Sequence, residues 1–513
     1  MAFRLRLKGP DTEPLWRRID AGVRAAIEDG RLRPGDRLPS VADVAKDLGV
    51  ARLTVVKAFR ELEEAGLVTA HVGRGTFVAN GRAAAGSTAA AGPRRPRNRP
   101  GEVAPAGSDP TQSLRRIREG YARSVRDLVR LERRPGTIDL TGGVPDPGSV
   151  PAGELERLTS KVLAVDPRRL YGYGGETGLL ELRTAIARTL GRTGIDVDAR
   201  RVVVTNGSQQ AISLVAAWAR EDGRSILCET PTYSGVPNAF HLFGQAVASV
   251  PWDEEGLPLD ALRAAAAPGT RPLLYTCPDH QNPTGRTMTA ARRRELAAWA
   301  SETGAVVVDD AIFRDLHFDG TPVESLYGLL PVGQRVLVGS VSKSFMPGLR
   351  VGYLVADEAL LEALKPAKRT MDVATPPLVQ AVAAAFLEDG YEAHLAEVRA
   401  GYRARRDAVI SALEASMPEG TTWTRPDGGF QLWVTLPEGV SALDLFVRGL
   451  AHGVAIGPGP AYDMDGRYTG SFRLGYAPGT LADLTEGVRR IARALEDLRL
   501  RRGTDAASAG AHV

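Results

Sequence analysis

Hydrophobic and polar residues follow different patterns in different parts of the chain. Near the N-terminus, apolar residues recur at helical spacing in 15–30, 40–49 and 51–67, and each segment ends at or beside a glycine. Ser40 is expected to cap the second helix, with an aspartate three residues later. Residues 67–80 alternate apolar and polar side chains around a Gly-Arg-Gly tip, which predicts a β-hairpin. Two helices joined by a short glycine-containing turn predict a helix-turn-helix.

Further along, short β-rich runs are separated by helical stretches. The clearest runs are 201–208, 225–233, 305–313 and 335–343. Strands that are almost continuously apolar and that alternate with helices predict an α/β fold, with a mostly parallel sheet covered on both faces. From about residue 391, long helices with few strands predict a smaller α+β lobe.

Between these two patterns lies a segment with almost nothing to bury. Residues 81–110 are mainly Ala, Gly, Pro, Arg and Ser, so they cannot offset their ordering entropy and predict a flexible linker. Their five arginines suit a solvated tether or, alternatively, weak contact with nucleic-acid phosphates. We therefore expect the following divisions: a helix-turn-helix domain over 12–80, a linker over 81–112, a large domain over 113–500 and a disordered tail over 501–513.

Composition narrows the class of protein without deciding the function. The 513 residues are 43% hydrophobic and 25% charged, which is an ordinary globular balance, and the net charge of +4 is too small to indicate nucleic-acid binding by itself. The only cysteines, Cys228 and Cys277, have no metal-binding spacing, so we predict a reducing cytoplasm and no metal site. Neither a signal peptide nor a membrane span is expected.

The N-terminal pattern indicates which residues would meet DNA. In a helix-turn-helix, early residues of the second helix reach base edges in the major groove. Here these are Arg52, Thr54 and Lys57, while Ser40 is positioned for a phosphate and Arg74 for the neighbouring minor groove. The pattern alone fits a small protein-binding domain equally well.

The residues themselves resemble the winged helix-turn-helix of the GntR family of bacterial transcription regulators. The matching motifs are "RLPS" from Arg37, "GV-x-R-x-TV", "LEEAGLV" and "GRGTFV". The resemblance implies a double-stranded DNA operator as partner and includes Arg37 among the DNA-binding residues. Ala51 departs from the family, which often has serine there, so one possible phosphate contact is removed.

In the large domain, a single lysine stands on a serine-rich turn. Lys343 alone would be an ordinary surface residue, but its neighbours describe a pocket for an anionic, ring-shaped cofactor. Backbone N–H groups at the helix start near residue 208 suit an anion. The side chains expected around that anion are Ser208, Gln209, Ser340, Ser342 and Arg350, the last as a cationic clamp.

Polar residues at strand ends suit the ring of such a cofactor. Asp310 ends a buried strand, where open α/β sheets place ligand groups, and a pyridinium nitrogen is a suitable partner for it. The alternative is an acid that caps a loop or holds a local ion pair. Asn282 could donate to a phenolate oxygen, and Tyr233 could stack on the ring.

About residues 135–500 resemble a fold-type I, class I/II aminotransferase. The motifs "GGVPDP", "YGGETGLLELR", "NGSQQ", "P-x-x-QNPTG", "VDDAIF", "SVSK-x6-R" and "FRLGY" occur in the family's order. The resemblance implies the cofactor pyridoxal 5'-phosphate, held by Lys343 as an internal aldimine. It further implies these roles: Asp310 pairs with the ring nitrogen, Asn282 contacts the ring oxygen, Tyr233 stacks, Arg473 grips a substrate carboxylate, Gly143 lines that site, and Tyr173 reaches the phosphate of the neighbouring subunit in a homodimer.

One departure from the aminotransferase pattern concerns the ring oxygen. The family usually has a tyrosine three residues after the ring aspartate, and this chain has Phe313. The missing hydroxyl should alter the pKa of the aldimine and slow turnover, while cofactor binding remains possible.

A GntR-type reader, a linker and an aminotransferase-like domain together resemble the MocR subfamily. This resemblance implies a transcription regulator whose large domain senses pyridoxal phosphate, or an amino acid or amine, through Lys343. The alternative is a working aminotransferase that carries a DNA-binding domain. A third possibility, a DNA-binding scaffold with a dead domain, fits poorly with so complete a pocket.

Overall fold

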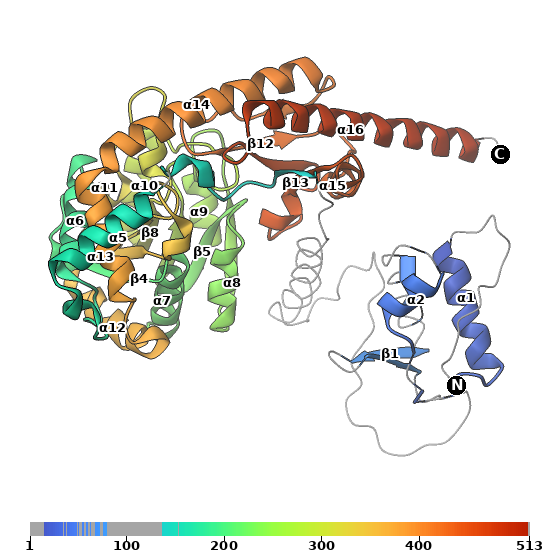
Figure 1. The fold of residues 1–513 in the computed structure, drawn as a ribbon, viewed down its shortest axis with the longest axis horizontal. Helices are drawn as coiled ribbons and strands as arrows, with labels where there is room; N and C mark the ends of the chain where they lie inside the picture. The colour runs from blue at the N-terminus through green and yellow to red at the C-terminus, as the bar shows by residue number, and fades with distance from the viewer. Residues whose placement is uncertain are drawn as a thin grey trace. The chain divides into compact units, whose positions relative to one another are not determined.

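The structure, a computed structural model, divides into two compact units between residues 104 and 105 (Figure 1). The residues that it describes are 15–33, 35–36, 38–48, 50, 54–55, 58–59, 62, 67–71, 75–78, 136–151 and 153–510. No helix in the described part of the chain is long and apolar enough to cross a membrane.

The N-terminal unit contains the first two predicted helices and both strands of the predicted hairpin, and the described residues 54–55, 58–59 and 62 of the third predicted helix are helical. Its labelled elements are α1 (Leu15–Glu28), α2 (Val41–Leu48), β1 (Val68–His71) and β2 (Gly75–Val78). The two strands pair antiparallel, as the alternation predicted. The hydroxyl of Ser40 accepts from the backbone N–H of Asp43 at 3.2 Å, so the predicted cap of α2 is confirmed. The buried core of this unit includes Ile19, Val44 and Val55, which come from three helical segments.

The large sheet of the second unit has seven strands in the order β4-β10-β9-β8-β7-β5-β6. Their bounds are β4 Val202–Thr205, β5 Ser225–Thr230, β6 Val247–Pro251, β7 Pro272–Thr276, β8 Val306–Asp310, β9 Arg335–Ser340 and β10 Gly352–Ala356. Only β10 runs against its neighbours, β4 and β9, so the predicted mostly parallel sheet is confirmed. Parallel strands carry their C-terminal ends to one edge, where ligand groups gather.

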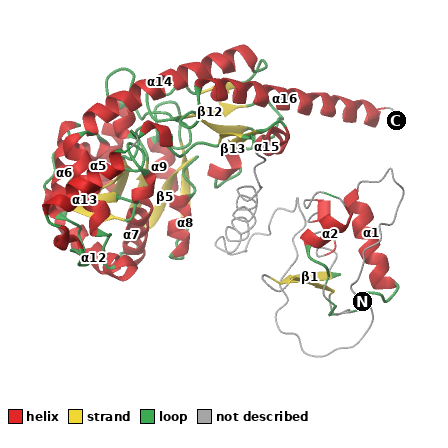
Figure 2. Ribbon diagram, in the orientation of Figure 1, coloured by secondary structure: helices red, strands yellow, loops and turns green. Residues whose placement is uncertain are grey.

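Helices cover both faces of this sheet (Figure 2). Successive residues of a strand face opposite sides, so Leu337 of β9 belongs to one hydrophobic cluster, while Val336 and Val338 belong to another. The covering helices are α5 Glu154–Val165, α6 Leu180–Arg192, α7 Ser208–Glu221, α8 Gly235–Leu242, α9 Leu259–Ala265, α10 Ala290–Thr303, α11 Leu326–Leu329, α12 Glu358–Asp372 and α13 Pro377–Asp389. Short 3-10 turns lie at Pro147–Ser149, Pro167–Leu170, Ala199–Arg201, Arg314–Leu316, Pro347–Leu349 and Gly459–Tyr462.

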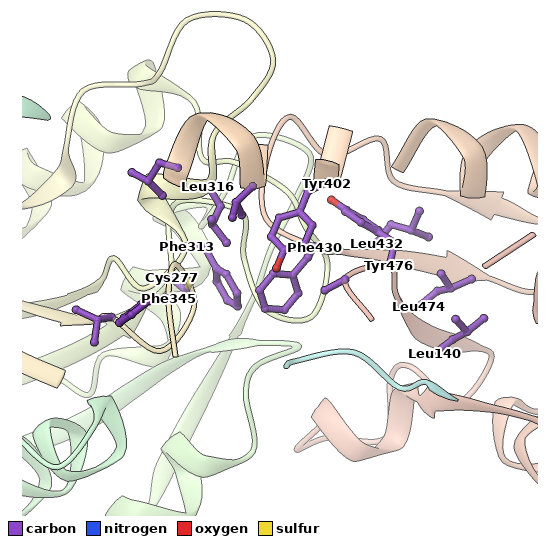
Figure 3. Close-up of a cluster of buried hydrophobic side chains, with 14 of the residues drawn as sticks. Leu140, Cys277, Phe313, Leu316, Phe345, Tyr402, Phe430, Leu432, Leu474 and Tyr476 are labelled. Carbon is purple, nitrogen blue, oxygen red and sulfur yellow. The ribbon is translucent and has the colours of Figure 1, made fainter. Parts of the chain in front are cut away.

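The smaller lobe is built on a five-stranded sheet in the order β11-β12-β14-β13-β3. Its elements are β3 Ile138–Leu140, α14 Tyr391–Ser416, β11 Thr422–Trp423, β12 Gln431–Thr435, α15 Ala442–Ala451, β13 Val454–Pro458, β14 Ser471–Gly475 and α16 Leu481–Gly510. Strand β3 comes from far earlier in the chain and pairs parallel with β13. Buried rings and aliphatic side chains, among them Phe313, Phe430 and Leu474, join the two lobes into one core (Figure 3).

Helix α16 differs from the sequence prediction at its C-terminal end. The tail was predicted to be disordered from residue 501, but the helical backbone continues to Gly510. Extending an existing helix requires only one more residue to be fixed for each added hydrogen bond, so a polar, alanine-containing tail can continue a helix that packing has already formed. Residues 511–513 lie outside the described residues.

A close backbone contact ties β10 to the turn before α7. A Cβ on Gly352 would lie 2.4 Å from the carbonyl carbon of Gly207. Because that carbon belongs to the backbone, it cannot move aside as the end of a flexible side chain could. We expect Gly352→Ala to lower the free energy of unfolding by about 1–3 kcal/mol, the usual cost of overpacking. Gly348→Ala is the matched control, because nothing lies within 4 Å of its Cβ position. Equal denaturant midpoints for the two variants, followed by tryptophan fluorescence, would contradict this packing.

Candidate functional site

Lys343 lies on the turn after β9, at the carboxyl edge of the large sheet. Its ammonium donates a hydrogen bond to the carbonyl oxygen of Gly143 at 2.7 Å. Burial and the positive charges of Arg473 and Arg350 lower the pKa of Lys343 to about 8, against the opposing effect of the Asp310 carboxylate. At pH 7, about a tenth of this amine is therefore neutral and so nucleophilic, far more than for an ordinary lysine.

A cradle for an anion forms where α7 begins. Gly207 precedes the helix with a φ of 81°, and a Cβ there would lie 2.4 Å from Nη2 of Arg350. Only glycine therefore lets this guanidinium approach the helix N-terminus so closely. Ser208 is the first residue of α7, where unpaired backbone N–H groups and the helix dipole favour negative charge.

Ser342, Ser340 and Gln209, which were also expected at the anion, differ in their hydrogen bonds. The hydroxyl of Ser342 is buried and has no hydrogen-bond partner among the described residues, which leaves it available to a ligand oxygen. Ser340 instead donates to the carbonyl of Val351 at 3.0 Å and accepts from the N–H of Ser342, so it braces the turn. The side-chain amide of Gln209 donates to the carbonyl of Gly235 at 3.0 Å.

The two adjacent acids at the end of β8 face opposite sides of the sheet. Asp310 accepts hydrogen bonds from the phenol of Tyr275 and from the N–H of Ile312, and burial raises its pKa to about 6. Asp309 accepts from the N–H of Tyr327 at 2.9 Å, on the other face. Alternation along the strand thus leaves Asp310 as the carboxylate on the lysine side, where its charge acts on Lys343.

Arg473 of β14 connects the small lobe to the edge of the large sheet. Its Nη1 donates to Oδ1 of Asn282 at 2.7 Å and its Nε donates to the carbonyl of Thr141 at 2.8 Å. Its guanidinium also lies over the ring of Tyr462, 4.7 Å from the centroid. Gly143 has a φ of 87°, and a Cβ there would come within 3.1 Å of Nη2 of Arg473. Gly143 therefore lies between Lys343 and Arg473.

The two tyrosines expected at the cofactor lie in different surroundings. Tyr233 is partly exposed next to Gln209, and burial together with the negative charge of Asp310 raises its pKa. Tyr173 is 81% exposed, and its expected role toward a neighbouring subunit stays a prediction.

Phe313 makes the region beside the lysine apolar. Its ring is fully buried and packs edge-on against Phe430 (Figure 3), at a centroid distance of 5.3 Å. Nζ of Lys343 lies 5.9 Å from the centroid of the Phe313 ring. The position where the family has a hydroxyl is therefore a hydrocarbon surface in this chain.

Sequence reasoning missed Tyr275, the phenol that holds Asp310. The residue lies on β7 and pairs with Val308 of β8, so its contact with Asp310 depends on strand register. The only signal in the sequence was one tyrosine within an otherwise apolar strand.

Two of the residues expected to contact DNA lie in the described part of the chain. Thr54 is helical and half-buried, and Ser40 is exposed at the start of α2 with its hydroxyl engaged by Asp43. The other expected contacts lie outside the described residues: Arg37, Arg52, Lys57 and Arg74.

Comparison with protein families matches two separate parts of the chain. Residues 138–491 match the family "Aminotransferase class I and II", and residues 15–78 match "Bacterial regulatory proteins, gntR family". The pair of domains implied by the resemblance to the MocR subfamily is thereby confirmed.

Individual relatives fall into two groups. The HTH-type transcriptional regulator TauR of Rhodobacter capsulatus is 31% identical, over 94% of this chain and 96% of its own. The 2-aminoadipate transaminase of Thermus thermophilus is 36% identical, over 74% of this chain and 94% of its own. A multiple substrate aminotransferase from Thermococcus profundus has a similar solved structure, with a TM-score of 0.70, 32% identity and coverage of 74% of this chain and 95% of that one.

The environment of Lys343 makes its reactivity depend on pH in a definite direction. Because burial and Arg473 disfavour the protonated amine, Lys343 should become neutral as pH rises through about 8, whereas an ordinary lysine does so near 10.4. Competitive acetylation read by mass spectrometry should therefore show a midpoint near 8 for Lys343 in the cofactor-free protein. Arg473→Gln should raise that midpoint and Asp310→Asn should lower it. A wild-type midpoint above 10, unchanged in both variants, would contradict the electrostatic account.

Proposed function

The chain belongs to the aminotransferase class I and II family and carries a gntR-family regulatory domain, and on that premise we propose that it is a transcription regulator. Its large domain would bind pyridoxal phosphate and sense a small amine through Lys343, and its N-terminal domain would bind a double-stranded operator. The observation that carries the proposal is the joining of a GntR domain to a pocket in which Lys343, Asp310 and Arg473 act on one another electrostatically. TauR, which matches both parts, is named as a regulator.

The residues at the sheet edge fit pyridoxal phosphate. The cofactor's phosphate suits the cradle of Gly207, Ser208 and Arg350, and the unpaired hydroxyl of Ser342 suits one of its oxygens. Asp310, with a pKa of about 6, is mostly ionised at neutral pH and would hold a protonated ring nitrogen. When bound, the cofactor supplies an aldehyde that captures primary amines.

Arg473 determines which amines the pocket would accept. Its guanidinium faces the lysine and suits a carboxylate, so the proposed effector is an amino acid or related amine, with pyridoxal phosphate itself as the variant effector. A carboxylate at this position would compete with Asn282 for Nη1 of Arg473. Such competition would favour one arrangement of the lobes, and ligand binding would then shift the population toward it.

The proposal also includes assembly and location. We infer a homodimer in the cytoplasm, in which Tyr173 would reach the partner's pocket. In this proposal the DNA-binding domain spans 12–80, the linker 81–112 and the sensing domain 113–500. A dimer would allow a change within each large domain to alter the spacing of two DNA readers.

A working aminotransferase is the second candidate. It is favoured by relatives that are named as aminotransferases and by the retention of Lys343, Asp310, Asn282 and Arg473 at one site. Phe313 weighs against rapid turnover, because the hydrocarbon surface beside Lys343 supplies no hydroxyl for the ring oxygen. Steady conversion of an amino acid and a 2-oxo acid by the purified chain would establish this second function.

Lys343→Ala tests the link between pocket and DNA. Fluorescence anisotropy with DNA from upstream of its own gene should show that pyridoxal phosphate, alone or with amino acids, changes the affinity of the wild-type chain. The variant should still bind this DNA but should lose the change. Lys161→Ala is the matched control, because Lys161 is an exposed lysine paired with Asp389. A Lys343→Ala chain that kept the wild-type response to every effector would contradict the sensing role of the lysine.

A further inference from the structure

A second group of polar side chains lies outside the lysine pocket, where three loops meet. His280 precedes the "QNPTG" turn after β7, His317 follows the 3-10 turn after β8, and Asp427 lies in the β11–β12 connection of the small lobe. One ligand atom from each lies within 4.8 Å of the others. None of the three is used by the proposed pyridoxal phosphate site. We infer that His280, His317 and Asp427 form a binding site for a divalent transition-metal ion of the zinc type.

The tautomer of His317 leaves a lone pair facing the carboxylate. Its Nε2 is 3.2 Å from the carbonyl oxygen of Gly320, and a carbonyl only accepts, so Nε2 carries the hydrogen. Nδ1 is then an acceptor, 3.9 Å from Oδ2 of Asp427, which is also an acceptor. Two acceptors that face each other suit a cation between them, and a ring N–H bonded to a backbone carbonyl is usual for metal-binding histidines.

His280 approaches the other oxygen of the same carboxylate. Its Nδ1 is 3.1 Å from Oδ1 of Asp427, and the hydroxyl of Thr287 donates to that oxygen at 2.7 Å. Without an ion, Nδ1–H of His280 can donate to Asp427. Binding of an ion through Nδ1 would release that proton, as metal binding to histidine generally does.

His280 has an uncommon backbone conformation and a tightly packed ring. His280 has a φ of 50°, in the left-handed region that non-glycine residues rarely adopt. The ring lies against Gly428, where a Cβ would come within 2.2 Å of the imidazole, so only glycine fits. The ring is 1% exposed and lies nearly parallel to the ring of His317, with an interplanar angle of 21° and a centroid distance of 5.6 Å. One of the two rings would therefore turn when both Nδ1 atoms bind one ion. Strained residues held by their surroundings often occur at binding sites.

An ion can reach this site from solvent. Asp427 is 39% exposed and lines a cavity of about 570 Å³ together with Asp319, Gly320, Arg406 and Arg425. The positive charge of Arg406 is offset by its ion pairs with Asp319 and Asp407. Water from this cavity would complete the coordination of an ion held by three protein ligands.

The ligand set indicates the kind of metal. Two imidazole nitrogens and one carboxylate oxygen suit zinc, cobalt, nickel or iron, whereas calcium and magnesium prefer oxygen ligands. Neighbouring ligand atoms around a tetrahedral ion bound at about 2.0–2.1 Å lie roughly 3.3–3.4 Å apart. Nδ1 of His280 is 3.1 Å from Oδ1 of Asp427 and Nδ1 of His317 is 3.9 Å from Oδ2, so the exposed Asp427 and the histidine rings would adjust on binding. The ion would connect both lobes at the base of the loop that carries Asn282.

Cobalt is a direct probe of this inference, because its visible absorption reports coordination. Full-length protein, with any affinity tag removed and after treatment with a chelator, is titrated with Co²⁺ and then with Zn²⁺ as competitor. We expect one saturable Co²⁺ site per chain that Zn²⁺ displaces and Ca²⁺ does not.

Variants distinguish this site from adventitious binding. His317→Ala and Asp427→Asn should each weaken Co²⁺ binding at least about 100-fold, since even the loss of an outer partner costs 10–100-fold. Asparagine keeps the shape of the exposed Asp427, so its packing is retained. His452→Ala is the matched control, because His452 pairs with Asp497 at 2.8 Å elsewhere on the lobe. Absence of saturable binding by the wild type, or wild-type affinity in both variants, would overturn the inference.

Discussion

The site depends on one guanidinium. Arg473 extends from β14 of the small lobe, is 8% exposed, and makes hydrogen bonds with Asn282 across the lobes and with Thr141 beside it. Its charge also lowers the pKa of Lys343, so the same side chain positions the lobes and keeps part of the amine population neutral. A buried cation needs such partners, because desolvation would otherwise make it costly. A ligand carboxylate that replaced one of them would act on lobe position and lysine chemistry together.

Much of this arrangement could be predicted from the sequence because local patterns determine it. Apolar strands alternating with helices predicted the mostly parallel sheet, and such sheets bring strand ends to one edge, so Asp310 and Lys343 were expected together. Contacts that depend on register or on tertiary packing could not be predicted in this way. The phenol of Tyr275 reaches Asp310 only because β7 and β8 pair in one particular register, and Ser340 uses its hydroxyl to brace its own turn.

The histidine cluster shows the same limit more clearly. His280 and Asp427 belong to different lobes, and no spacing along the chain relates them. The inferred ion and Arg473 would both act where the lobes meet, the ion through His280 just before the "QNPTG" turn and Arg473 through Asn282 within it. The position of that turn is thus the feature that both ligands would control.

The most direct test is to ask whether the chain selects DNA and whether the cofactor changes the selection. Purified full-length protein would be incubated with sheared DNA from its own genome, with and without pyridoxal phosphate, and the retained fragments sequenced. The account predicts retention of a few sites upstream of its own or neighbouring genes, in a pattern that depends on pyridoxal phosphate. No specific retention in either condition would contradict it and would favour the aminotransferase.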